Sequence, residues 1–289
     1  MGIIYFILQP VLMAALAPLV SGVITWLKNN LRRRQGPGIF QPYFNLAKCF
    51  GKDEIVSEHA SWVFRAAPYI VLAATLTAAC LVPAFFRIGL AQYAGDFIAL
   101  IFLLSLGRFF LALAGLDPAS AFGGMGSSRE MFISSFVEPV VLLAIFGVSL
   151  SLGTTNLLAV SAARALTIPA ALAVLALFVA TLAETSRLPV DNQETHLELT
   201  MVHEAMVLEY SGRSLALLEL ASYLKQLIFF TLIVNLLPGF YWLKLCGLAA
   251  AVALVELSLA KMRLFRVVDL LAFAALLSFL SIVGLVLGL

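Results

Sequence analysis

The stretch FIALIFLLSLGRFFLALA, residues 97–114, is a continuous apolar run that contains a single charged side chain, Arg108. An α-helix needs about 20 such residues to cross the ~30 Å hydrocarbon core of a bilayer. A strand of a membrane barrel would instead alternate apolar and polar residues over about ten positions. The stretch therefore predicts a transmembrane helix.

Seven further apolar runs of this kind lie along the chain of 289 residues, which is 62% hydrophobic and only 12% charged. This composition lies outside the usual range of soluble domains. We therefore predict an all-α integral membrane protein in which residues 1–289 form one transmembrane domain with eight helices. The expected spans are Ile3–Leu27, Ala66–Phe86, Phe97–Ala114, Phe136–Leu152, Ala165–Ala183, Leu215–Leu237, Tyr241–Ala260 and Val267–Gly288.

The basic residues are distributed unevenly between the two sets of connections. Thirteen Lys and Arg residues lie in one set, and only Arg87, Arg164 and Lys244 lie in the other. Because basic loops are retained in the cytoplasm, both termini are expected outside the cell. The cytoplasmic loops then comprise residues 28–65, 115–135, 184–214 and 261–266. Three of these loops are long, which suggests that a soluble partner docks on this face.

Cys49, Cys80 and Cys246 are far apart in sequence, and they form neither a disulfide framework nor a metal-binding spacing. We expect no catalytic residue, metal or cofactor in this chain. Any redox centre that the function requires is then expected in a partner subunit.

The first two cytoplasmic loops contain turn and helix signals. Gly36, Pro37 and Gly38 predict a turn, and apolar residues at helical spacing predict an interfacial helix over Gln41–Phe50. The basic run at residues 32–34 either contacts a partner or faces lipid phosphates.

In the second loop, three glycines are expected to break the chain before a helix that starts with a capping box, Ser127 and Glu130. Arg129 and Glu138 lie at or within the start of a span, where an unpaired charge costs about 2.5–3.5 kcal/mol. We expect them to pair with each other or with other partners.

The third loop contains ETHLELTMVHEAMVLEYSG, residues 194–212. If this stretch is one helix, Glu194, Glu198 and Glu209 share a face, and His196 and His203 point to the opposite side. This geometry disfavours a metal site. The acidic face is either solvated or part of a proton relay, because ionisable residues also lie at or within the adjoining spans at Glu184, Glu219, Lys225 and Glu256.

Four separate motifs, RRQGPGIFQP, GSSREMFISSFVEP, AETSRLPVDNQE and LEYSG, resemble the membrane subunit shared by respiratory complex I, where it is subunit 1 or H, and the membrane-bound nickel-iron hydrogenases. The resemblance covers nearly the whole chain and is greatest to the hydrogenase branch, represented by formate hydrogenlyase. The sequence departs from the complex I pattern at Pro189, Asn45 and Ile133, in a shortened Gly-Pro loop, and in three extra residues between Asp191 and Tyr210. These departures argue against quinone binding.

The resemblance implies a membrane anchor and ion-conducting subunit that performs no redox chemistry itself. The expected partners are hydrogenase large and small subunits with nickel-iron and iron-sulfur centres, iron-sulfur subunits and an antiporter-like membrane subunit, in a prokaryotic cytoplasmic membrane. The alternatives are the quinone-site subunit of a quinone oxidoreductase and a purely structural anchor. The ion, H⁺ or Na⁺, and the electron donor stay open.

The residues expected to carry this function fall into two sets. The expected proton path comprises Glu138, Glu184, Asp191, Glu194, Glu198, Glu209, Glu219, Lys225 and Glu256. The expected interface and structural residues are Arg34, Gly36, Pro37, Gln41, Pro42, Gly123, Gly124, Arg129 and Arg187.

Overall fold

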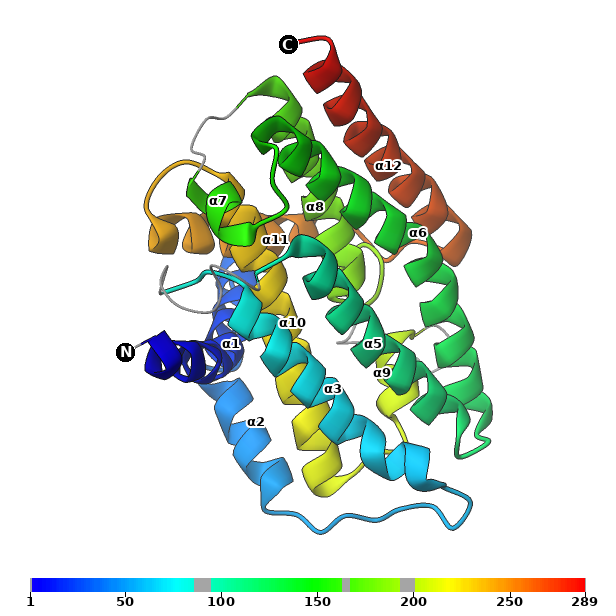
Figure 1. Cartoon of the computed structure of the whole chain (residues 1–289). Helices are drawn as coiled ribbons and strands as arrows, with labels where there is room; N and C mark the ends of the chain where they lie inside the picture. Colours follow the sequence, from blue (N-terminus) through cyan, green and yellow to red (C-terminus); the bar gives the residue numbers. More distant parts are fainter. Residues whose placement is uncertain (1, 86–94, 163–166, 193–200, 289) are drawn as a thin grey trace.

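The computed structural model describes residues 2–85, 95–162, 167–192 and 201–288 (Figure 1). Within these ranges the regular structure is helical, apart from one isolated β-bridge between Asp96 and Asn156. The helices are α1 (Gly2–Leu31), α2 (Gln41–Phe50), α3 (Trp62–Leu81), α5 (Phe97–Leu116), α6 (Ala121–Leu152), α7 (Leu157–Ala162), α8 (Ile168–Glu184), α9 (His203–Val207), α10 (Gly212–Leu236), α11 (Tyr241–Ser258) and α12 (Leu264–Val286).

The structure confirms the all-helical membrane architecture. In the described part of the chain, seven helices are long and apolar enough to cross a membrane: α1, α3, α5, α6, α10, α11 and α12. The remaining predicted span corresponds to α8, an apolar helix of 17 residues. At a rise of 1.5 Å per residue, α8 is about 26 Å long, near the lower limit for a spanning helix.

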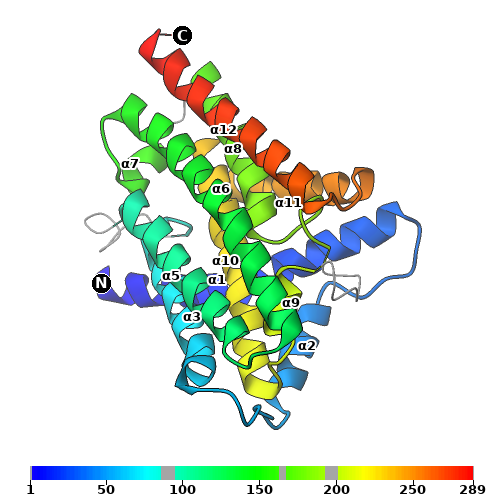
Figure 2. The same ribbon diagram turned by 90° about the vertical axis from the view of Figure 1, so that its right-hand side faces the viewer.

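Helix α10 lies at the centre of the molecule, where it contacts α1, α2, α3, α7, α8 and α11. Helices α6, α8 and α12 pack side by side along one flank, while α1 runs across the other helices rather than along them (Figure 2). The helix predicted over Gln41–Phe50 is confirmed as α2, with the bounds expected from its apolar spacing. The central position of α10 brings its side chains close to segments that are far apart in sequence.

The start of the fourth span differs from the prediction. Helix α6 begins at Ala121 rather than at Phe136, and its N-cap is Ser120, whose hydroxyl accepts a hydrogen bond from Gly123 N at 3.2 Å. The expected capping box is therefore wrong. The Ser127 hydroxyl donates to the Ala112 carbonyl at 2.9 Å, and Glu130 is buried.

The acidic stretch is not one helix in its described part. Helix α9 ends at Val207, and α10 begins at Gly212, whose φ of 52° is left-handed. Glu209 lies in the turn between these two helices, so the single helix on which the predicted common face depends is wrong. Glu194, Glu198 and His196 lie outside the described residues. A turn forms here in place of one continuous helix, because glycine adopts the left-handed conformation at little cost.

The glycines of the second loop do not break the chain. They lie within α6, where two of them allow close packing against neighbouring helices. A Cβ at Gly123 would overlap the Gly115 carbonyl and lie 2.8 Å from the Ser120 hydroxyl. A Cβ at Gly126 would lie 2.9 Å from the Ala205 Cβ on α9. Gly124 faces open space. The contacts at Gly123 and Gly126 hold the first turns of α6 against α5 and α9, so deletion of residues 123–128 would disrupt this packing as well as any docking surface.

We expect Gly123→Ala to lower the free energy of unfolding by about 1–3 kcal/mol, the usual cost of overpacking. Gly124→Ala is the matched control: it adds the same methyl group one residue away into open space, and the better helix propensity of alanine contributes up to about 1 kcal/mol. Thermal melting of the purified protein in detergent measures both effects. Equal melting temperatures would contradict the close packing at Gly123.

Candidate functional site

Arg108 of α5 is buried between the helices and contacts three carboxylates. Its Nη1 lies 2.9 Å from Oε1 of Glu138 on α6, and its Nη2 forms an ion pair with Glu184 at the end of α8. Its Nε lies 3.8 Å from Glu130, also on α6. The Ser105 hydroxyl donates to Glu138 at 2.7 Å. This one guanidinium therefore ties together α5, α6 and α8.

Glu184 lies between two cations. Its second carboxylate oxygen is 2.8 Å from Nζ of Lys225, which belongs to the central helix α10. The Glu184 side chain is only 3% exposed. A buried charge without partners would be very unfavourable, so Arg108 and Lys225 keep this carboxylate in the interior. Arg108, Glu130, Glu138, Glu184 and Lys225 are called the inner cluster below.

A second group of ion pairs surrounds Glu256 of α11. Its carboxylate lies 3.1 Å from Nζ of Lys28 on α1 and 3.0 Å from Nη1 of Arg187. Arg187 also donates to Ser21 and to Gln226, both at 3.0 Å. Because Gln226 follows Lys225, and Arg187 lies three residues after Glu184, this second group adjoins the inner cluster.

Asp191 organises the start of α9. It is 1% exposed, and its carboxylate lies 2.7 Å from Nζ of Lys261. The same carboxylate accepts hydrogen bonds from the backbone N–H groups of Val202 at 2.9 Å and His203 at 3.3 Å. A negative charge at this position also interacts favourably with the helix N-terminus. Asp191 therefore fixes residues 202–203 against the segment that follows α8.

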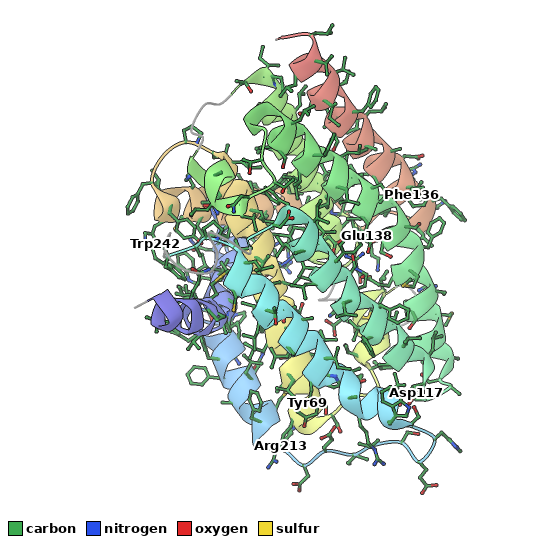
Figure 3. All side chains as sticks on the ribbon, viewed as in Figure 1. Tyr69, Asp117, Phe136, Glu138, Arg213 and Trp242 are labelled. Carbon is green, nitrogen blue, oxygen red and sulfur yellow. The ribbon has the colours of Figure 1, made fainter. Side chains whose placement is uncertain are left out.

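A row of cavities follows these ion pairs. The largest, of about 510 Å³, is lined by Lys28, Arg187, Asp191 and Glu256 among other polar groups. The second, of about 40 Å³, contains the inner cluster except for Glu138 and shares Ser186 with the first. A third, of about 10 Å³, contains Glu138 and shares Arg108 and Glu184 with the second. Glu138 projects between α5 and α6 (Figure 3).

Ser186 lies where the first two cavities meet and has an unusual backbone conformation. Its φ of 49° is left-handed, which is uncommon for a residue other than glycine. Such a conformation costs about 1–3 kcal/mol and is often retained at functional sites. The strained backbone of Ser186 therefore lies at the junction between the first and second cavities.

The structure brings six of the predicted functional residues into this region. They are Glu138, Glu184, Arg187, Asp191, Lys225 and Glu256. The sequence interpretation did not assign four of their charged partners: Lys28, Arg108, Glu130 and Lys261. Arg108 was recognisable, because it is the single charged residue of the span Phe97–Ala114, whereas Lys28 and Lys261 look like ordinary loop cations.

Other predicted path residues lie elsewhere. Glu219 lines a separate cavity of about 80 Å³ together with His203, Glu204 and Tyr223. This cavity is called the side cavity below. Glu209 follows α9, is half-buried and lines none of these four cavities. Glu194 and Glu198 lie outside the described residues.

Arg129 and Glu138 do not pair with each other. Glu138 pairs with Arg108, whereas Nη1 of Arg129 donates to the backbone carbonyl of Met201 at 3.2 Å. In the described structure, Arg129 therefore connects α6 to the segment before α9 through this hydrogen bond.

The predicted interface residues at the first loop surround the largest cavity. Pro37, Gln41 and Pro42 line it, and a Cβ at Gly36 would overlap the Asn29 side chain. Arg34 is exposed. The Gly-Pro loop therefore forms part of the cavity wall, while Arg34 faces outward.

Tyr210 in the LEYSG motif holds the end of the third loop in place. Its ring stacks on Phe64 with centroids 3.9 Å apart, and its hydroxyl donates to the Phe64 carbonyl at 2.8 Å. Burial raises the pKa of the Tyr210 phenol, so it stays a donor at neutral pH. Ser211 bonds to both backbone groups of Ile55. The motif is structural.

Among the described residues, no three His, Cys, Asp or Glu side chains are arranged to hold a metal ion. What the structure does contain is a multi-spanning membrane protein with a polar cavity that leads to paired buried charges.

Comparison with known proteins agrees with this architecture. The family model described as NADH dehydrogenase matches residues 3–287, so the chain belongs to this family of membrane subunits. Hydrogenase-4 component C of Escherichia coli K12 is 33% identical over 92% of this chain and 84% of its own length. Formate hydrogenlyase subunit 4 of the same organism is also 33% identical, over 79% of this chain and 75% of its own length.

A more distant relative is NADH-quinone oxidoreductase subunit 8 of Rhodothermus marinus, 28% identical over 72% of this chain and 63% of its own length. The fold also matches a chain of an archaeal respiratory membrane complex, the membrane-bound sulfane sulfur reductase. That match has a TM-score of 0.85 and covers 98% of this chain and 99% of the other at 18% identity.

We expect Arg108→Gln to destabilise the protein by about 3–5 kcal/mol, because it removes the Arg108 ion pairs of Glu130 and Glu138 and leaves Glu184 with Lys225 alone. Arg129→Gln is the control, since Arg129 loses only one hydrogen bond to a backbone carbonyl, worth about 1.5–3 kcal/mol at most. Melting temperatures in detergent compare the two variants. If Arg108→Gln is no less stable than Arg129→Gln, Arg108 is not the main neutralising charge of the inner cluster.

Proposed function

We propose that this chain is the membrane anchor and ion-conducting subunit of a membrane-bound nickel-iron hydrogenase complex of the formate hydrogenlyase type. Two relatives that are 33% identical over the aligned residues, hydrogenase-4 component C and formate hydrogenlyase subunit 4, support this choice of complex. The basic loops, including residues 28–65, then face the cytoplasm of a prokaryotic cell, and both termini face outside.

The observation that carries ion conduction is the row of cavities and ion pairs from Glu256 to Glu138, in which neighbouring cavities share lining residues. Charged residues are expensive within membrane spans and commonly mark ion routes. In this row each carboxylate lies beside a cation that can stabilise its ionised form. A proton that enters the largest cavity would pass Ser186 to reach Glu184 and then Glu138.

Partners would supply the redox chemistry. Hydrogenase large and small subunits and iron-sulfur subunits would carry the nickel-iron and iron-sulfur centres, and an antiporter-like membrane subunit would receive the ion. Cys49, Cys80 and Cys246 of this chain belong to α2, α3 and α11, and no pair of them shares a helix. In this division of labour, this chain anchors the complex and conducts the ion.

The polar lining of the largest cavity disfavours the quinone-site alternative. Twelve of its lining side chains can form hydrogen bonds, and its aliphatic side chains are Pro37, Pro42 and Leu188. A quinone would need predominantly apolar walls for its ring and tail. Such a cavity is better suited to water, which would connect the ion pairs.

A tag on this chain should purify hydrogenase and iron-sulfur subunits from membranes solubilised in mild detergent. The complex should evolve hydrogen from reduced methyl viologen, because the redox centres are expected in the partners. Mass spectrometry identifies the subunits, and gas chromatography measures the hydrogen. Recovery with a quinone-reducing soluble arm instead would overturn the hydrogenase assignment.

Glu138→Gln should keep the complex assembled and its hydrogen evolution unchanged, while vesicle acidification per hydrogen is lost. Glutamine keeps the size and hydrogen-bonding capacity of glutamate but does not titrate. Arg108 would still contact Glu130 and Glu184, so the fold should survive. Glu58→Gln, an exposed change in the first loop, is the control. Normal acidification by assembled Glu138→Gln would favour a pure anchor.

A further inference from the structure

His203 occupies a position that neither the proposed path nor the sequence interpretation uses. It lines the cavity of about 40 Å³ that contains Arg108, Glu184 and Lys225. It also lines the side cavity, next to Glu219. The two cavities share His203, Leu218 and Ser222. Of these three side chains, only imidazole exchanges protons near neutral pH.

The backbone fixes His203 at this junction. Its N–H donates to the Asp191 carboxylate, which is itself paired with Lys261. Gly126 allows α6 to approach the following turn of α9 closely. The sequence interpretation placed His203 on the face opposite the acids, but that geometry required one continuous helix through residues 194–212. A helix as short as α9 does not maintain that alignment.

The surroundings of His203 suit proton exchange. The charged groups that act on it are Glu204, Lys225 and Asp191, and burial lowers the pKa of its imidazole. The ring is therefore neutral at pH 7, with one nitrogen that donates and one that accepts. Acids flank it on both sides, with Glu219 in the side cavity and Glu184 and Glu130 in the inner cluster.

We propose that His203 passes protons between the side cavity and the inner cluster, which gives the conducting row a second entrance. One imidazole nitrogen accepts a proton from the Glu219 carboxyl group, the other releases its proton toward Glu184 or Glu130, and Glu219 regains a proton from water. Tyr223 lines both the side cavity and the largest cavity, so this branch bypasses Ser186. The inference rests on the proposed proton conduction.

The test measures acidification of vesicles that contain the whole complex, driven by hydrogen evolution from reduced methyl viologen. His203→Gln should lower acidification per hydrogen about three- to tenfold, less than the 10²–10⁴-fold typical of an essential acid–base group. The effect is partial because the Ser186 route remains. His59→Gln is the matched control, since His59 is exposed in the first loop. Hydrogen evolution should be unchanged in both variants.

Chemical rescue separates proton transfer from a structural role. Added imidazole should restore acidification in His203→Ala, which leaves space at the junction, but not in Glu138→Gln. Glu219→Gln should reproduce the partial loss without rescue, which keeps the test valid if the His203 variants fail to assemble. Normal acidification by Glu219→Gln, or loss in His203→Ala that imidazole does not restore, would overturn this branch.

Comparison with Glu138→Gln distinguishes the proposed branch through His203 from the proposed main path. If Glu138→Gln loses acidification while His203→Gln and Glu219→Gln retain it, the branch is wrong and the main path stands. If all three acidify vesicles like the unmodified complex, the proposed conduction itself fails.

Discussion

The ion pairs of Arg108 are the constraint on which the middle of the molecule depends. A buried guanidinium and buried carboxylates each lose several kcal/mol of solvation on entering the bundle, and only close pairing recovers that loss. To supply that pairing, α5, α6 and α8 must bring Arg108, Glu138 and Glu184 together. Lys225 of the central helix α10 then pairs with the carboxylate of Glu184.

The same ion pairs explain why the cavities lie beside the charged residues. Apolar side chains fill gaps efficiently, whereas ion pairs between helices impose fixed distances and leave small polar cavities that can hold water. The cavities follow the paired charges from Glu256 to Glu138 and share lining residues at Ser186, Arg108 and Glu184. The proton conduction that we propose rests on this coincidence of paired charges and cavities.

Several sequence motifs that resemble a functional signature are structural in this chain. LEYSG anchors the third loop through Tyr210 and Ser211, and the Gly-Pro loop forms one wall of the largest cavity. The glycines before the fourth span permit close helix contacts at Gly123 and Gly126 rather than a break. Each of these motifs therefore has a structural role that the contacts of the fold explain.

The sequence by itself determined the membrane architecture, the helix α2 and the identity of Glu138, Glu184, Lys225 and Glu256 as charged candidates at or within the spans. Apolar runs and isolated charges have a cost in lipid that does not depend on their neighbours, so they can be recognised one residue at a time. Only the tertiary structure decided that Arg108 neutralises Glu138, that α6 starts at Ala121 and that α9 ends at Val207. It also placed His203 between two cavities. Those features depend on contacts between distant segments, which periodicity along the chain does not encode.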